Sequence, residues 1–411
     1  MSRLRLAPVA GCIAFVSVIG AGSGGASSGP SATPKGKPIV LGLPIALSGA
    51  LNFADGSFYT AIQIAVKDFN NSGGALGRPL KIAAQDTKSD IAASGTAALD
   101  LIAKGAHFIL PTTDYDYGSP AARVAQQKGL LALTNVGDPR FGVKGVGPNV
   151  YNIYQATPTE GAAAAQFAYS IKKWRRAYVL EDTTLNYTKT LCKYFKESWQ
   201  HLKGSTVGSD TFQNGDPSIA GQITKLKSIN PKPDFIMSCS YPPGGFSALR
   251  QIRAAGITTP ILGGAAFDGT FWLTSIPQQL NFYSLSEGVI SGDPNPIRES
   301  IFRKYRQTTH KQVVYTTTLL GGYSIVQALV KAIKRAGSIE TKAVKAQLDK
   351  FRNEPLVIGP TTWTPQCHIR RGAPFVIIQP TTKPVTVNGI RAQKVNYIAT
   401  VKPKFVPKAI C

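Results

Sequence analysis

The stretch that decides the fold runs from residue 39 to residue 86 and reads IVLGLPIALSGALNFADGSFYTAIQIAVKDFNNSGGALGRPLKIAAQD. Its first part, 39–47, is a short apolar run that predicts a strand. Apolar residues then recur at helical spacing until a Gly-Gly pair, which predicts a helix over 56–74. A second strand is predicted over 79–86. A strand, a helix and a strand of this length are typical of a parallel pair joined by a crossover helix.

The same alternation continues along the chain. Helices are predicted over 90–105 and 119–129, and strands over 107–112 and 130–135. A second series of helices and strands occupies 159–265, followed by three more helical patterns and a tail of short strands; these lie at 296–309, 316–337, 340–351 and 360–401. The predicted fold class is therefore α/β, with two doubly wound lobes built on mostly parallel sheets.

The first residues read as an export signal rather than as part of the fold. Arg3 and Arg5 precede a short apolar core, and small residues follow, so residues 1–26 are predicted to be a signal peptide and residues 27–37 a flexible tether. The VAGC stretch ending at Cys12 resembles a lipobox, but few residues precede it, so secretion without a lipid anchor is favoured unless the true start codon lies elsewhere. The mature chain is expected to be secreted, periplasmic or on the cell surface.

Four cysteines follow the predicted leader, at Cys192, Cys239, Cys367 and Cys411. An even number of cysteines in an exported chain suggests disulfides, and four cysteines allow three connectivities. We favour Cys192 with Cys239 and Cys367 with Cys411, because each pair then stays within one region of the chain. No cysteine or histidine spacing indicates a metal site.

The chain is strongly basic, with a formal net charge of +24. Its lysines and arginines are dispersed, without dense runs or interleaved aromatic residues, so nucleic acid is not expected as a partner. A basic solvated surface with affinity for anionic envelope polymers or lipid headgroups is the preferred interpretation.

Catalysis has no positive support in the sequence. GAGSGG at 20–25 and GASSG at 25–29 match enzyme-like patterns, but both lie in the leader and tether, where no strand precedes them. The four histidines show neither metal spacing nor a nucleophile partner. The prediction is a protein that is not an enzyme and needs no cofactor or metal.

In a doubly wound sheet, ligands bind outside the carboxyl ends of the strands, where helix N-termini also point. The loops at those ends are rich in Tyr, Phe, Asp, Ser and Thr, side chains that suit a ligand with an apolar part, a carboxylate and an ammonium. They cover 47–56, 112–119, 135–141, 181–188, 240–245 and 265–272. Any one of these residues could equally be a turn or a helix cap, and it is the recurrence in both lobes that favours a site.

One of these loops is unusual. The sequence DYDYG at 114–118 follows an apolar strand and precedes Ser119 and Pro120. Ser119 can cap a helix and Pro120 suits its first turn, which predicts that 114–118 is a loop facing the ligand. Its acids suggest a ligand with donors or a positive charge, and its tyrosines suggest an apolar or planar part.

The stretch at 39–86, together with DFIMSCSYPPGGFSALRQIRAAGI, EGVISGDPNP and GGYSIVQALVKAIKRAGS in this order, resembles the type I periplasmic binding proteins. The nearest branch is the leucine/isoleucine/valine-binding receptors of branched-chain amino acid ABC transporters. The resemblance covers nearly all of the mature chain. It implies two lobes that close on a small ligand and a receptor that signals its loaded state to a membrane permease.

The family's architecture implies a hinge of three crossover segments, near Tyr151–Pro158, Ser286–Asp293 and Pro355–Thr362. Lobe 1 would contain 38–153 and 292–357, and lobe 2 would contain 156–290 and 358–411. A monomer is the family expectation.

The resemblance also implies contacts on both lobes. By position, the ligand-binding residues would be Ser48, Phe53, Tyr115, Asp116, Tyr117, Val136, Asp138, Tyr187, Tyr241 and Asp268. The family's ammonium-binding glutamate is absent, and Asp268 could substitute for it. The implied ligand is an amino acid or a related small polar metabolite. Alternatives are a receptor for amides, urea or aromatic acids, or an extracellular sensor with the same fold.

Overall fold

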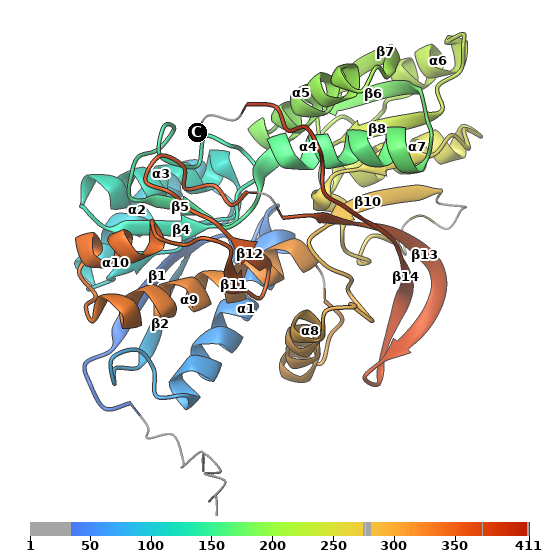
Figure 1. Cartoon of the computed structure of the whole chain (residues 1–411). Coiled ribbons are helices and arrows are strands. Elements are labelled where there is room, and N and C mark those ends of the chain that lie inside the picture. The colour runs from blue at the N-terminus through green and yellow to red at the C-terminus, as the bar shows by residue number, and fades with distance from the viewer. Residues whose placement is uncertain (1–33, 274–275, 277–280, 314, 372, 409–410) are drawn as a thin grey trace, which may run out of the picture.

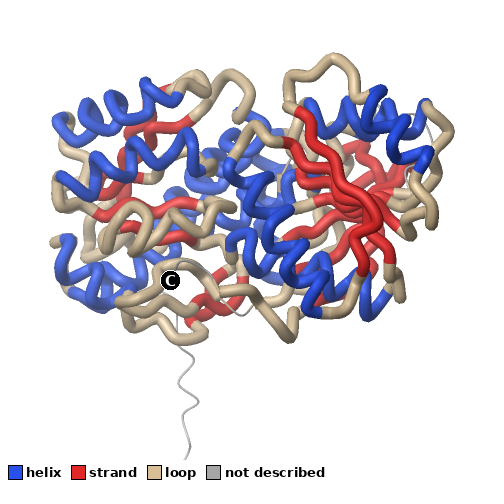
Figure 2. Tube along the Cα trace, turned by 90° about the horizontal axis from the view of Figure 1, so that it is seen from above, coloured by secondary structure: helices blue, strands red, loops and turns tan. Residues whose placement is uncertain are grey.

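The computed structural model describes residues 34–273, 276, 281–313, 315–371, 373–408 and 411. The predicted signal peptide and most of the predicted tether lie outside the described residues. Two lobes lie side by side, each a sheet with helices on both faces (Figures 1 and 2). Within the described residues, no helix is both long enough and apolar enough to cross a membrane.

Lobe 1 contains a five-stranded parallel sheet with the order β2-β1-β3-β4-β5. Its elements in chain order are β1 (Ile39–Ile45), α1 (Asn52–Asn71), β2 (Leu80–Asp86), α2 (Ile91–Ala103), β3 (Phe108–Ile109), α3 (Tyr115–Gln127), β4 (Leu131–Thr134) and β5 (Val150–Asn152). The predicted strand–helix–strand unit at the start of the chain is confirmed, with β1 and β2 in parallel register from Ile39–Leu80 to Ile45–Asp86. Helix α1 begins four residues earlier than predicted, at Asn52.

Lobe 2 contains a seven-stranded sheet with the order β14-β13-β10-β9-β8-β6-β7, parallel from β10 to β7. Its elements are α4 (Ala156–Gln166) with a π-helical turn at Phe167–Ile171, β6 (Arg176–Asp182), α5 (Asn186–His201), β7 (Ser205–Phe212), α6 (Ala220–Ser228), β8 (Phe235–Cys239), α7 (Gly244–Ala254), β9 (Ile261–Gly263), the 3-10 turn η2 (Ala265–Phe267), β10 (Phe282–Ser286), β13 (Phe375–Val387) and β14 (Ile390–Val401). Antiparallel β13 and β14 extend the sheet at one edge.

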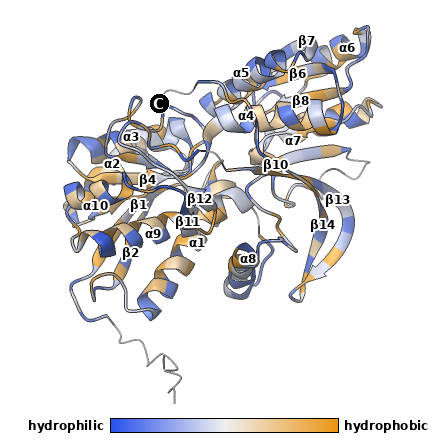
Figure 3. Cartoon of the chain, viewed as in Figure 1, coloured by the Kyte–Doolittle hydropathy of each residue, from blue (hydrophilic) through white to orange (hydrophobic). Residues whose placement is uncertain are grey.

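Between β10 and β13 the chain returns to lobe 1. It forms α8 (Pro296–Thr309), α9 (Thr316–Ala336), α10 (Thr341–Leu348) and the hairpin of β11 (Glu354–Leu356) with β12 (Gly359–Thr361). Helix α9 packs along α1, and their buried residues share one hydrophobic core with β1. Figure 3 shows both hydrophilic and hydrophobic faces on α8, whose buried side includes Phe302 and Tyr305.

The third expected crossover, Pro355–Thr362, is instead the hairpin of β11 and β12, which binds lobe 1. The Val357 amide donates to Gln327 and the Ile358 amide to Ser324, both at 2.9 Å and both on α9. Residues 363–370, assigned to lobe 2 from the sequence, also contact lobe 1, and the chain crosses to lobe 2 only after Arg370, before β13. The hairpin is held there because two amides of its turn donate to side-chain oxygens on α9.

The predicted loop at 114–118 is wrong. Helix α3 begins at Tyr115, and Asp114 rather than Ser119 is its N-cap: the Asp114 carboxylate accepts from the amides of Asp116 and Tyr117. Gly118 permits this early start, because a Cβ there would lie 2.3 Å from the carbonyl oxygen of Thr112. Asp114 is the stronger cap because its charge also interacts favourably with the helix dipole.

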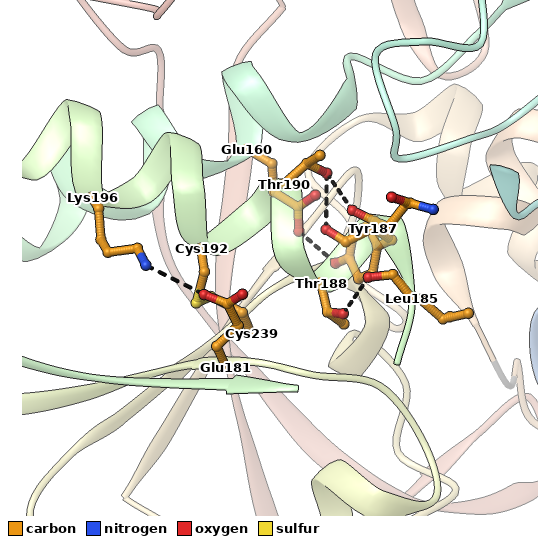
Figure 4. The surroundings of a disulfide bond; sticks show 10 residues. Glu160, Glu181, Leu185, Tyr187, Thr188, Thr190, Cys192, Lys196 and Cys239 are labelled. Carbon is orange, nitrogen blue, oxygen red and sulfur yellow. Dashed lines mark hydrogen bonds and ion pairs between the residues drawn. A yellow bond between two sulfur atoms is a disulfide. The ribbon is translucent and has the colours of Figure 1, made fainter. Parts of the chain in front are cut away.

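Both favoured disulfides are present. Cys192 on α5 is bonded to Cys239 on β8, and Cys367 is bonded to Cys411. The first pair lies in the core of lobe 2 and fixes α5 against the sheet (Figure 4). Figure 4 also shows Tyr187 at the start of the same helix, so this disulfide anchors the helix that carries a cavity residue.

Candidate functional site

A cavity of about 60 Å³ lies between the lobes at the carboxyl ends of both parallel sheets. All six strand-end loops singled out in the sequence contribute to its wall. The lining residues are Leu51, Phe53, Ala54, Thr113, Asp114, Asn135, Gly137, Tyr154, Leu185, Tyr187, Tyr241, Ala266, Tyr315, Thr317 and Thr318. The cavity is thus walled by both lobes, in the position where doubly wound folds bind ligands.

Aromatic side chains form much of the wall. Phe53 and Tyr315 come from lobe 1, Tyr187 and Tyr241 from lobe 2, and Tyr154 from the connection between the lobes. The rings of Phe53 and Tyr315 are tilted at a centroid distance of 5.6 Å. Phe53 also stacks on Phe271, at 6.0 Å, so an aromatic contact crosses between the lobes at the edge of the cavity.

Asp114 is the acidic residue of the wall. Its Oδ1 accepts from the amide of Asp116 at 2.8 Å, and the residue is buried. Burial, together with the nearby charge of Asp116, raises the pKa of the Asp114 carboxyl to about 7. A cationic group in the cavity would stabilise its ionised form.

Glu160 lies directly behind the wall. Its Oε1 accepts from the Tyr187 hydroxyl at 2.8 Å (Figure 4) and from the Ala265 amide at 2.6 Å. Burial raises the pKa of the Glu160 carboxyl to about 7. Gly264 leaves room for this arrangement, because a Cβ there would lie 2.6 Å from both Glu160 Oε1 and the Tyr187 hydroxyl. Glu160 therefore fixes the orientation of the Tyr187 ring.

Three of the ten residues expected at the site line the cavity, namely Phe53, Tyr187 and Tyr241. Tyr117 is close to them: it packs against the cluster formed by Leu185, Tyr241 and Ala266. The remaining six do not line the cavity, and each has other partners.

Four of those six interact within lobe 1. The Ser48 hydroxyl donates to Asp86 at 2.7 Å, and the Val136 amide donates to Asn152 at 3.0 Å. Asp138 is fully buried and accepts two hydrogen bonds from the Arg140 guanidinium. The same guanidinium lies 4.3 Å from the centre of the Tyr115 ring.

The other two, Asp116 and Asp268, hold the lobes together. Asp116 on α3 accepts from the backbone amide of Asn186 at 2.9 Å and from its side-chain amide. Asp268 follows β9 in lobe 2 and accepts from the amides of Thr316 and Thr317, at 2.9 and 2.8 Å. Each acid therefore caps a helix of the opposite lobe, α5 in one case and α9 in the other. Neither helix has a side-chain cap from its own N-cap residue. We call these contacts the trans-caps.

Sequence reasoning missed part of the wall. Tyr315, Thr317 and Thr318 lie at the start of α9, which is far from the other loops in sequence and carries no acid or turn signal there. Tyr154 was placed in a crossover segment, and Glu160 was hidden in an alanine-rich helix. Within the described residues, no group of three or more His, Cys, Asp or Glu side chains could hold a metal ion.

Comparisons with known proteins agree with the fold. The family model described as periplasmic binding protein matches residues 38–382. The Leu/Ile/Val-binding protein of Escherichia coli strain K12 is 24% identical over 339 residues, covering 77% of this chain and 84% of the relative.

Two solved structures share the fold. The branched-chain amino acid transporter substrate binding protein of Streptococcus pneumoniae, in complex with isoleucine, has a TM-score of 0.74 at 20% identity and covers 88% of this chain and 99% of its own. A solute binding protein of an ABC transporter from Rhodopseudomonas palustris BisB5, in complex with 3,4-dihydroxy benzoic acid, has a TM-score of 0.74 at 14% identity and covers 90% and 99%.

The chain belongs to the type I periplasmic binding proteins, in the family of the branched-chain amino acid receptors. Proteins of this family are extracytoplasmic, bind small molecules and work with ABC transporter permeases. The fold and the relatives are those of solute-binding receptors, not of enzymes.

Proposed function

We propose that this protein is the extracytoplasmic receptor of an ABC transporter, which closes its lobes on an amino acid or a related small polar metabolite and delivers it to a membrane permease. The observation that carries the proposal is the cavity to which six strand-end loops, three from each lobe, contribute. A ligand that touches both lobes stabilises the closed state relative to the open one, and this difference is what a permease could recognise.

The chemistry of the wall supports a ligand that bears an amine. Related receptors have been solved with isoleucine and with 3,4-dihydroxy benzoic acid, which differ in whether they carry an ammonium. Here the acidic Asp114 faces the ligand space, and Tyr187 is backed by Glu160. Two carboxyl groups near the ligand favour an ammonium-bearing solute over an aromatic acid.

The proposal is tested by thermal shift, on protein that carries both disulfides and lacks residues 1–26. The panel contains amino acids, alkylamines, amides, urea and aromatic acids. A ligand that binds only the folded state raises the free energy of unfolding, by about 2.7 kcal/mol when it is present at 100 times its Kd. The melting temperature rises as a result. We expect at least one member of the amino acid and amine groups to produce such a shift.

A matched pair of glycine variants places the binding in this cavity. In Gly137→Ala the new Cβ would lie 2.3 Å from the Tyr187 ring, so the ring is pushed into the ligand space and the thermal shift should disappear. In Gly215→Ala the new Cβ meets nothing within 4 Å, so the shift should remain. Absence of a shift with every compound, or an equal shift in both variants, would contradict the proposal.

A further inference from the structure

The threonine hydroxyls in the cavity wall already donate to acceptors of the protein. The Thr113 hydroxyl donates to Asp55 at 2.7 Å, and the Thr318 hydroxyl donates to the carbonyl of Ala54 at 2.9 Å. The Thr317 hydroxyl donates to Asp268 at 2.5 Å. A ligand carboxylate would normally be held by such groups. In this cavity they are bound to internal acceptors instead.

Three helix N-termini around the cavity are occupied by carboxylates of the protein, whereas α1 has no side-chain cap and its Asn52 and Ala54 amides donate to backbone oxygens. The first amides of α3 donate to Asp114, those of α9 donate to Asp268, and that of Asn186 on α5 donates to Asp116. A free helix N-terminus is the usual site for an anionic ligand group. Here three N-termini each carry a carboxylate of the protein, which fills the position that a ligand anion would take.

The groups that remain available are two acceptors and the hydroxyl of Tyr154, which has no partner among the described residues. The hydrogen bonds from α3 end on Oδ1 of Asp114, which leaves Oδ2 for a ligand. The Oδ1 atom of buried Asn135 has no partner among the described residues. None of the described residues that line the cavity is Lys, Arg or His. Arg140, a nearby cation, is bound to Asp138 through both Nε and Nη2.

The aromatic wall also favours a positively charged ligand. Ring faces carry partial negative charge and attract organic cations, most strongly where water is excluded. Five aromatic side chains from both lobes and their connection surround this small space. A carboxylate would face repulsion from the rings and from Asp114 together, whereas an alkylammonium is attracted to both.

From these contacts we infer that the ligand is a small organic cation, an alkyl- or arylammonium, whose charge lies against Asp114 and among the aromatic rings and whose recognition requires no carboxylate. The inference rests on the proposed receptor function and narrows its solute class. It separates this chain from a receptor that holds the carboxylate of an amino acid.

The test is calorimetric titration with three compounds of the same branched skeleton. They are leucine, 3-methylbutylamine (leucine without its carboxylate) and 4-methylpentanoate (leucine without its ammonium). We expect the amine to bind at least 10-fold more tightly than leucine, and the acid to give no measurable binding. Choline and its neutral isostere 3,3-dimethylbutan-1-ol form a second pair, in which only the cation should bind.

Two variants that keep their helix caps test the role of Asp114. Asp114→Asn retains a side-chain acceptor for α3 but removes the charge, and should weaken binding of 3-methylbutylamine by at least 10-fold. Asp90→Asn makes the same change at the N-cap of α2, outside the cavity, and should leave binding unchanged. Circular dichroism shows whether each variant is folded.

The outcomes separate this inference from the proposed function. Leucine or 4-methylpentanoate binding more tightly than the amine would overturn the inference and leave the receptor function intact. Equal affinities in Asp114→Asn and Asp90→Asn would also overturn it. Absence of binding by the amine and by choline overturns it too, and the wider thermal-shift panel then decides whether the receptor function stands.

Discussion

Asp268 binds two residues of the opposite lobe and does not line the cavity. Its two carboxylate oxygens accept from the amides of Thr316 and Thr317, from the Thr317 hydroxyl and from the Ser286 hydroxyl at 3.1 Å. Burial raises the pKa of this carboxyl to about 7, while the four hydrogen bonds act in the opposite direction. The residue therefore contributes to closure of the lobes rather than to ligand charge.

Asp268→Asn should accordingly weaken the binding of every ligand by a similar factor. Asparagine keeps one acceptor oxygen but turns an NH₂ group toward backbone and hydroxyl donors, which should cost the closed state about 1–2 kcal/mol. We expect equal losses for 3-methylbutylamine and leucine in calorimetry, roughly 5- to 30-fold each. Asp90→Asn serves as the control. A loss confined to the amine would mean that Asp268 contacts the ammonium after all.

Single residues of the site were only partly predictable from the sequence. Phe53, Tyr187 and Tyr241 were expected and line the cavity, because they follow strands whose carboxyl ends meet there. The helix start at Tyr115 was not expected, because Asp114 and Ser119 are both good caps and the sequence does not show which one the backbone uses. Tyr315 was not expected because it comes from α9, and its approach to the cavity depends on how the lobes close.

At the scale of elements, the Cys192–Cys239 disulfide joins α5 to β8 across a sequence separation of 47 residues. Closing a loop of that length in the unfolded chain corresponds to about 4 kcal/mol of stability in the chain-entropy model. Replacing both cysteines with alanine should lower the free energy of unfolding by an amount of this order, measured by urea denaturation.

Reductant provides the control for that variant. It should destabilise the wild type more than the double alanine variant, because only the Cys367–Cys411 bond remains to be broken in the latter. Equal stability of wild type and variant under oxidising conditions would contradict a stabilising role for the bond.

Elements with a strong apolar period were predicted well, and edge elements were not. Strand β7 was missed, because it lies at the sheet edge and most of its residues are exposed or half-buried. The tail was expected to form short strands, but β13 and β14 have 13 and 12 residues. Their ladder shifts register between Pro380 and Pro384, and a bulge of this kind is where a long strand can accommodate proline.

At the scale of the whole molecule, buried acids determine how stability depends on pH. Burial raises the carboxyl pKa of Asp114, Glu160 and Asp268 to about 7, from their ordinary values of 3.8, 4.5 and 3.8. Between pH 4 and 7 the folded chain therefore binds more protons at these sites than the unfolded chain does. Their contribution to stability is complete below pH 4 and is lost as the pH rises through 7.

We expect the ligand-free protein to lose stability between pH 5 and pH 8. A change larger than about 1.4 kcal/mol, which corresponds to one pKa unit on one group, should be visible in urea titrations. Burial lowers the pKa of His107, which makes stability rise with pH below pH 6.5. This is one half-buried group against three buried carboxyls, so we expect its effect to be the smaller one. Glu160→Gln should reduce the slope. A stability that rises from pH 5 to pH 8 would contradict this account.

Because of the trans-caps, each lobe supplies the N-terminal cap of a helix in the other lobe. The first amide of α5 donates to Asp116 of lobe 1, and the first amides of α9 donate to Asp268 of lobe 2. A chimaera that takes one lobe from a relative would keep both helix starts only if the incoming lobe carries the matching partner. Asp116 must therefore be exchanged together with Asn186, and Asp268 together with Thr316 and Thr317, when lobes are recombined to change the solute that such a receptor accepts.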